Sequence, residues 1–222
     1  MLKIAVVDDH LLFRKSLTLL VNSFKGMEVI IEAENGKDFL KQATFNTPDV
    51  VLLDLDMPVM NGYETCKILL EKYPNTKVLV VSQLSSRESV YKMMETGAHG
   101  YFTKNSHPEQ LEHALQSVVS EGIFFGTELS TLVKEAFHWE KVNPIPLKPH
   151  KDLLSEREIQ ILKMVCNEMI SKDIAQKLFI NVRTVETHRK HIIEKADSKN
   201  SLGAILFVLK HKMVSFEDLK IV

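Results

Sequence analysis

The feature that most constrains the fold of this chain is a set of short apolar runs without polar alternation. They are IAVV at residues 4–7, VVLL at 50–53 and VLVV at 78–81. A strand with an apolar residue at every position is buried on both faces. This pattern is typical of a parallel sheet that helices cover on both sides.

Amphipathic helical stretches alternate with these runs. Strands are predicted at residues 3–7, 28–33, 50–53, 77–81 and 100–102, and helices at 11–24, 36–45, 61–72, 87–96 and 107–121. Five strand–helix units with right-handed crossovers give an α/β, doubly wound, five-stranded parallel sheet. In such folds the chemistry lies at the carboxyl ends of the strands.

The pattern changes after this first part of the chain. A helical stretch at 127–138 leads to a segment with three prolines at 143–149, which predicts a stiff linker. Only helices follow, at about 171–179, 182–195 and 201–211, after a first one that Ser155 and Glu158 open as a capping box. We therefore predict a domain at 1–122, a linker helix and Pro-rich linker at 123–150, and a small all-α domain at 151–222.

Charge and cysteine content agree with two intracellular domains. Residues 151–222 carry 13 basic and 10 acidic residues, while residues 1–150 carry 15 and 19, so a mildly acidic part precedes a mildly basic one. Cys66 and Cys166 are far apart and are expected to be buried free thiols. The N-terminus reads directly into a strand and no long apolar run follows, so we expect a soluble cytoplasmic protein without a membrane segment.

Polar residues follow four of the predicted strands directly or closely, where each strand ends. Asp8 and Asp9 follow the first strand, Asp54 the third, Ser82 the fourth, and Lys104 the fifth. Alone, an Asp there is more often a capping or turn residue, Ser82 a turn hydroxyl and Lys104 a solvated surface lysine. In a parallel sheet, however, all of them converge on one rim. Three carboxylates without His or Cys ligands suit Mg2+. A lysine and a hydroxyl beside that ion make a site for a phosphoryl group, whose oxygens the metal and the ammonium would neutralise while Asp54 attacks the phosphorus.

Residues 1–122 resemble a CheY-type receiver domain, whose fold is flavodoxin-like. The matching segments are IAVVDDH at 4–10, LDLDMPVMNG at 53–62, VVS at 80–82 and GAHGYFTK at 97–104. The resemblance implies that Asp54 is the phosphoacceptor. It also implies that Mg2+ is held by Asp8, Asp9, Asp54 and the backbone carbonyl of Asp56.

The same resemblance assigns three further residues. Lys104 would pair with the phosphoryl group, Ser82 would move to bond it, and Tyr101 would be an aromatic switch that turns inward. For Tyr101, simple packing of a strand aromatic on a neighbouring helix remains the alternative. Gln83 and the additional acid Asp56 depart from the usual pattern and leave the phosphoryl lifetime open.

The predicted helix at 182–195 is two-faced. Val182, Val185, Ile192 and Ala196 share one stripe, and Arg183, Thr187, Lys190 and Glu194 the opposite one, with Glu186 at its margin. Such a helix, after a short helix and a tight turn, suits the major groove of DNA. An ordinary solvated helix face is the alternative. Arg189 lies within the apolar stripe and is expected to reach outward to an acid or a phosphate.

Residues 152–214 resemble the LuxR-type helix-turn-helix, so the whole chain resembles a NarL/LuxR-type response regulator. The segments that carry it are LSEREIQIL at 154–162, SKDIAQKL at 171–178 and VRTVETHRK at 182–190. Glu168 and Asp197 replace two family glycines. The residues implied to contact DNA are Lys172, Arg183, Thr184, Val185, Glu186, Thr187, His188, Arg189 and Lys190. The residues implied to form a dimer interface are Leu202, Ile205, Leu206 and Leu209, on a helix that is apolar nearly all round. Deep burial of this helix is the alternative.

These expectations combine into one hypothesis. A histidine kinase phosphorylates Asp54, and the protein then binds double-stranded DNA as a homodimer, on DNA or when phosphorylated, without being a dedicated enzyme. One rival is a metal-dependent phosphatase of the haloacid-dehalogenase type, suggested by Asp54 and Asp56. In those enzymes, however, the acid pair ends the first strand. A second rival is a receiver whose tail binds a protein or RNA.

Overall fold

The computed structural model describes residues 1–83, 92–93, 95–124, 131, 154–167 and 169–215. The chain splits into two compact units, one of residues 1–84 with 96–124 and one of residues 85–95 with 125–222, and each is described by itself. The predicted helix at 127–138 and the linker at 143–149 lie outside the described residues. Of the predicted helix at 87–96, residues 92, 93, 95 and 96 are described and are helical.

The first unit contains the predicted parallel sheet. Its strands are β1 (Leu2–Val7), β2 (Met27–Ala33), β3 (Val50–Leu53), β4 (Lys77–Ser82) and β5 (Gly100–Thr103). They pair in parallel in the order β2-β1-β3-β4-β5. This order is the doubly wound arrangement of the flavodoxin-like fold, and the predicted fold class is confirmed.

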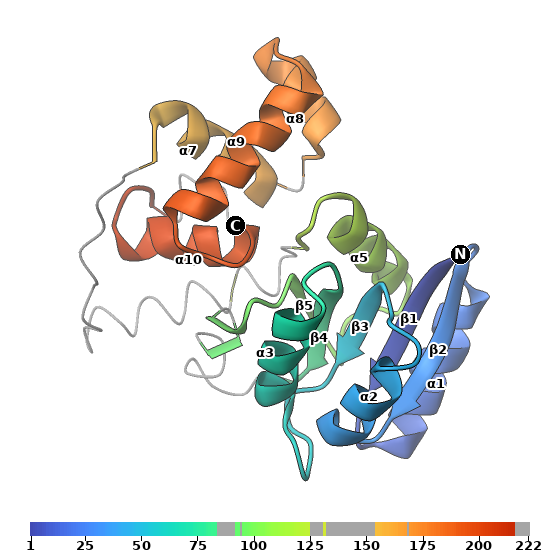
Figure 1. Ribbon diagram of the computed structural model, residues 1–222. Helices are drawn as coiled ribbons and strands as arrows, with labels where there is room; N and C mark the ends of the chain where they lie inside the picture. The colour runs from blue at the N-terminus through green and yellow to red at the C-terminus, as the bar shows by residue number, and fades with distance from the viewer. Residues whose placement is uncertain (84–91, 94, 125–130, 132–153, 168, 216–222) are drawn as a thin grey trace. The chain divides into compact units, whose positions relative to one another are not determined.

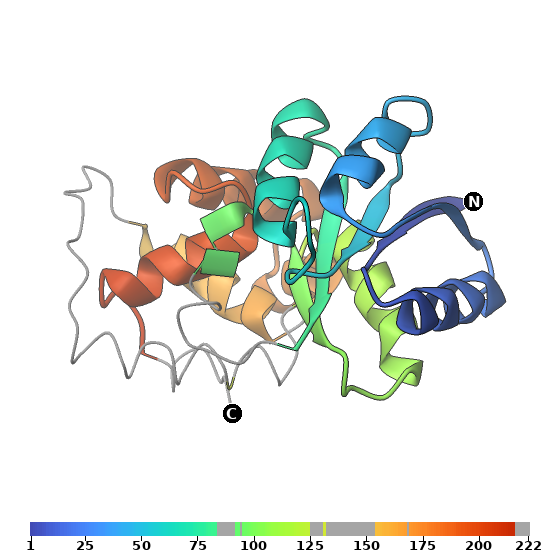
Figure 2. The same ribbon diagram turned by 90° about the horizontal axis from the view of Figure 1, so that it is seen from below.

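Helices cover both faces of this sheet. They are α1 (Leu11–Ser23), α2 (Gly36–Ala43), α3 (Gly62–Lys72) and α5 (Glu109–Ser120). Seen from below, α1 and α5 lie on one side of the sheet, and α2 and α3 on the other (Figure 2). Ile4 and Val6 pack in one core with Leu17 of α1 and Leu115 of α5. Because successive side chains of a strand point to opposite faces, the apolar runs must fill both layers, and every residue of 4–7 is fully buried.

The second unit is a small helical domain (Figure 1). Its described helices are α7 (Glu156–Cys166), α8 (Ser171–Leu178), α9 (Val182–Lys195) and α10 (Ser201–Lys210). The predicted capping box is present, since the Ser155 hydroxyl accepts from the Glu158 N–H and the Glu158 carboxylate accepts from the Ser155 N–H. Buried Ile161, Ile174 and Ile192 form part of its core, one from each of α7, α8 and α9.

Two further expectations concern the described residues. Cys66 and Cys166 are both free and buried, as predicted. Among the helices that the structure describes, none has the length and apolar character that crossing a membrane requires.

Candidate functional site

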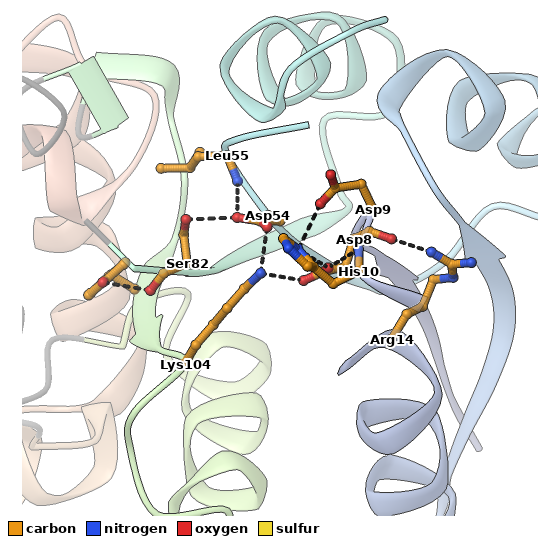
Figure 3. A network of polar contacts seen from close by, with 9 residues as sticks. Asp8, Asp9, His10, Arg14, Asp54, Leu55, Ser82 and Lys104 are labelled. Carbon is orange, nitrogen blue, oxygen red and sulfur yellow. Dashed lines mark hydrogen bonds and ion pairs between the residues drawn. The ribbon is translucent and has the colours of Figure 1, made fainter. Parts of the chain in front are cut away.

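The strand register brings the predicted acidic residues together. Val7 pairs with Leu53, and the Asp54 N–H donates to the Val7 carbonyl at 2.9 Å, so the ends of β1 and β3 are adjacent. Gly62, at the start of α3, packs directly against the Asp54 backbone. Only glycine fits there, because a Cβ would lie 2.1 Å from the Asp54 carbonyl oxygen. Figure 3 shows Asp8, Asp9, Asp54, Ser82 and Lys104 converging on one pocket.

Hydrogen bonds fix the Asp54 carboxylate. Its Oδ1 accepts from the Leu55 N–H and from the Ser82 hydroxyl, each at 2.7 Å, and its Oδ2 accepts from Lys104 Nζ at 2.5 Å. Asp54 is only 3 % exposed. A carboxylate held this way, beside an ammonium and a hydroxyl, has the surroundings that a nucleophile for phosphoryl transfer requires.

Lys104 bridges the two buried acids of the pocket. Its Nζ also lies 2.7 Å from Asp8 Oδ2, and 4.8 Å from the centroid of the Phe13 ring. Burial raises the pKa of Asp8 despite the contacts with Lys104. Burial alone would lower the pKa of Lys104, but its hydrogen bonds to Asp54 and Asp8 raise it. Lys104 therefore stays an ammonium and supplies a fixed positive charge.

The pocket also has the donor atoms of a divalent cation site. Asp8, Asp9, His10 and Asp54 each offer a ligand atom, and these atoms lie within 4.8 Å of one another. Among the described residues, Asp8 Oδ2 and Asp9 Oδ1 are buried oxygens without a hydrogen bond of normal geometry, although each lies close to a nitrogen, of Lys104 and His10 respectively. Buried carboxylate oxygens of this kind fit a hard ion such as Mg2+. Asp56 is exposed, beyond the cluster.

Ser82 and Tyr101 are linked in the structure. The Tyr101 side chain is buried at 2 % exposure, and its hydroxyl donates to the Ser82 backbone carbonyl at 2.7 Å. Both residues therefore already occupy inward positions, with the Ser82 hydroxyl on Asp54. Their roles as switch residues stay a prediction.

The α9 helix has the exposed polar face that its sequence predicts. Val185 and Ile192 are buried, at 0 % and 2 % exposure. Val182 departs from the predicted apolar stripe, being 36 % exposed, because it is the first residue of the helix. The exposed residues of the predicted contact set are Lys172, Arg183, Thr184, Glu186, Thr187 and Lys190. The Val185 side chain packs inside the domain, so it is not part of the exposed face.

Two predicted details around α9 can be compared with the structure. Arg189 Nη1 donates to the Ser171 hydroxyl of α8 at 2.8 Å, and its contact with an acid or a phosphate stays a prediction. Asp197, which replaces a family glycine, adopts the left-handed conformation with φ 46°, and the Ser198 N–H closes the helix end on the Ile193 carbonyl. Glu168 lies outside the described residues.

The predicted dimer helix α10 is buried within the single chain. The exposed fractions of its four predicted interface residues are 0 % for Leu202 and Ile205, 5 % for Leu206 and 6 % for Leu209. This burial agrees with the alternative interpretation of the apolar sequence of α10, namely that the helix is deeply buried. A dimer formed through these side chains requires that they first become accessible.

The structure adds one pocket residue that the sequence reasoning missed. His10 Nδ1 lies 3.0 Å from Asp9 Oδ1 and 3.6 Å from Asp8 Oδ1. The only signal for it in the sequence is its position directly after the acid pair. A residue after a strand end more often starts the next helix, and His10 does precede α1.

Comparison with known proteins agrees with the geometry. Residues 4–116 match the response regulator receiver domain, and residues 152–208 match the luxR family of bacterial regulatory proteins. The oxygen regulatory protein NreC of Staphylococcus epidermidis strain ATCC 12228 is 33 % identical over 219 residues, covering 97 % of this chain and 100 % of NreC. NreC of Staphylococcus carnosus is 30 % identical over 217 residues, again covering 97 % of this chain and 100 % of the relative.

Solved structures show the same architecture. The response regulator ChrA of a heme-sensing two-component system is similar with a TM-score of 0.52 and 27 % identity, over 96 % of this chain and 98 % of ChrA. The response regulator RcsB in its DNA complex has a TM-score of 0.57 at 17 % identity, over 94 % of this chain and 98 % of RcsB, which is a likeness of fold. This chain therefore belongs to the two-component response regulators that join a receiver domain to a LuxR-type DNA-binding domain, and it is a phosphorylation-controlled regulator of transcription.

Proposed function

We propose that Asp54 is the phosphoacceptor and that a cognate histidine kinase is its phosphoryl donor. The observation that carries this proposal is the Asp54 carboxylate itself, held by the Leu55 N–H, the Ser82 hydroxyl and the Lys104 ammonium. In the transfer, an Asp54 oxygen forms a bond to phosphorus as the N–P bond of the donor phosphohistidine breaks. The imidazole leaves as a neutral ring that keeps the proton on its other nitrogen, and an acyl phosphate remains on Asp54.

Each neighbour of Asp54 has a part in this step. Lys104 pairs with the phosphoryl oxygens, because it is already within 2.5 Å of Asp54 Oδ2. Asp8, Asp9, Asp54 and the backbone carbonyl of Asp56 would hold Mg2+, which when bound neutralises the charge that builds up on the phosphoryl oxygens. In this proposal the pocket accepts one phosphoryl group and later loses it, so we do not regard the protein as a dedicated enzyme.

The hydrogen bonds of Ser82 and Tyr101 suggest how the pocket reports its state. A phosphoryl group on Asp54 must take the place of the carboxylate as the acceptor of the Ser82 hydroxyl. Since Tyr101 donates to the Ser82 carbonyl, a shift of Ser82 also moves the anchor of Tyr101. The ends of β4 and β5 thus change together, which biases the protein between pre-existing states.

The output that we propose is binding of double-stranded DNA by a homodimer. The exposed face of α9 supplies Arg183 and Lys190 for phosphates, and Glu186, which can accept from a cytosine amino group, for base selection. Phosphorylation would favour exposure of Leu202, Ile205, Leu206 and Leu209 of α10, and two copies would then pair. A protein with these partners works in the cytoplasm, where we place it.

Incubation with acetyl phosphate and Mg2+ tests the phosphoacceptor. The wild type should gain one phosphoryl group, detected as an intact-mass increase, and Asp54→Asn should gain none. The matched control is Asp56→Asn, an equal change at an exposed acid two residues away, which keeps its backbone carbonyl and should still be labelled. Labelling of the Asp54→Asn protein would falsify the assignment. Sustained turnover of small phosphate esters would instead favour a phosphatase.

A further inference from the structure

The histidine next to the acid pair is held in place by its own backbone. The His10 N–H donates to Asp8 Oδ1 at 2.8 Å, and the Arg14 guanidinium donates to the Asp8 carbonyl, so the turn from β1 into α1 is tied down on both sides. His10 is the residue before α1, yet its ring makes no capping hydrogen bond with that helix. The ring instead lies beside the carboxylates of the pocket (Figure 3).

The distance from His10 Nδ1 to Asp9 Oδ1 matches the spacing between neighbouring ligands of one metal ion, and Asp8 Oδ1 lies somewhat farther away. His10 Nδ1 lies 3.0 Å from Asp9 Oδ1 and 3.6 Å from Asp8 Oδ1. At metal–ligand distances of about 2.1 Å, neighbouring ligands of an octahedral ion are about 3.0 Å apart. Asp9 Oδ1 is also a buried oxygen without a hydrogen bond of normal geometry. A cation placed among these atoms would satisfy this oxygen and the imidazole nitrogen together.

The nitrogen changes which ions the pocket prefers. Carboxylates alone suit Mg2+, whereas an imidazole favours borderline ions such as Co2+, Ni2+ and Zn2+. We propose that His10 Nδ1 is a metal ligand that, with Asp8, Asp9 and Asp54, lets this pocket bind a divalent ion of the Co2+ to Zn2+ class more tightly than Mg2+. This inference rests on the proposed phosphorylation pocket and adds a nitrogen ligand to it.

Co2+ is a suitable probe, because it is paramagnetic and reports its own ligands. In the full chain loaded with Co2+, the proton on the free ring nitrogen of a bound histidine gives a strongly shifted, exchangeable proton resonance. We expect this signal in the wild type and its loss in His10→Asn. The matched control is His107→Asn, the same change at an exposed histidine of the same unit, which should keep the signal.

Competition between Co2+ and Mg2+ supplies a second readout. His10→Asn should lower the preference for Co2+ over Mg2+ by about tenfold, the order of loss seen when a metal site is disturbed, and His107→Asn should leave it unchanged. A shifted signal that persists in His10→Asn, or an unchanged preference, would overturn the inference while leaving the magnesium pocket intact. Failure of the wild type to bind either ion would also overturn the proposal that this pocket is a divalent cation site.

Discussion

Val59 holds a left-handed backbone conformation, with φ 69°, in the loop between Asp54 and α3. A β-branched residue is strained there, because its Cβ crowds the backbone, at a cost of about 1–2 kcal/mol. The side chain is 77 % exposed, so little packing is lost on its removal. We expect Val59→Gly to stabilise the protein by about 0.5–1 kcal/mol after the greater freedom of the unfolded chain is subtracted.

Urea unfolding of the full chain, followed by circular dichroism, measures this difference. Val119→Gly is the matched control, since Val119 is also a partly exposed valine, at 44 %, but lies in the regular helix α5. Glycine is less favourable than valine in a helix, so this control should lose roughly a few tenths of a kcal/mol. Equal losses in both variants would show that Val59 is not strained.

At the scale of elements, Glu158 joins two helices of the DNA-binding unit. It is 3 % exposed, caps the start of α7 through Ser155, and lies 2.9 Å from Lys195 of α9. Burial would raise the pKa of Glu158, but the hydrogen bonds from Ser155 and Lys195 together lower it below the ordinary value of 4.5. The ionised carboxylate therefore adds stability above pH 4.5, and this stability is lost as the pH falls through the lowered pKa.

Glu158→Gln should remove this contribution. We expect the free energy of unfolding at pH 7 to fall by about 1–3 kcal/mol, as for a buried hydrogen bond to a charged group. Between pH 5 and pH 3.5, the variant should lose less further stability than the wild type does. Denaturant unfolding of the wild type and of Glu158→Gln at pH 7, 5 and 3.5 measures both differences. Glu156→Gln, the same change at an exposed acid of the same helical turn, should change stability by roughly a few tenths of a kcal/mol. A loss for Glu158→Gln that does not shrink in acid would contradict this account.

The elements themselves were predictable because their patterns are local. The runs at 50–53 and 77–81 identify β3 and β4 to within a residue, and Ser155 with Glu158 marks the start of α7. The convergence of Asp8, Asp54 and Lys104 also followed, since parallel strands end on one rim.

Contacts that depend on side-chain packing were not predictable. Arg189 donates to Ser171, eighteen residues away, and nothing in the pattern of α9 points to this contact. His99 reads as an ordinary loop residue, yet it accepts from the Val78 N–H, and burial, together with the charge of Lys77, lowers its pKa to about 3. The strain at Val59 likewise depends on the path of its loop. Contacts between residues that are distant in the sequence, or the path of a loop, decide these features, and the periodicity of the sequence encodes neither.

For the whole molecule, the proposed coupling of phosphorylation to dimerisation has a consequence for DNA binding. Each phosphate that a protein neutralises contributes about −0.9 to the slope of log affinity against log salt concentration. If phosphorylation converts a monomer into a dimer on DNA, twice as many phosphates are contacted. The slope of log affinity against log salt concentration should then become about twice as steep. If phosphorylation instead only made α9 of a monomer more accessible, the affinity would rise while the slope stayed that of the monomer.

Fluorescence anisotropy measures these slopes on duplexes that the phosphorylated protein selects from random DNA. Asp54→Asn treated with acetyl phosphate should keep the shallower slope. Lys190→Ala removes one exposed cation of α9, so it should reduce the slope by about 0.9 in the unphosphorylated protein and by about 1.8 in the phosphorylated one. Glu186→Gln should change the selected sequence while leaving the slope nearly unchanged, because an acid contacts no phosphate. An equal reduction by Lys190→Ala in both states would mean that one copy of α9 binds the DNA whether or not Asp54 is phosphorylated.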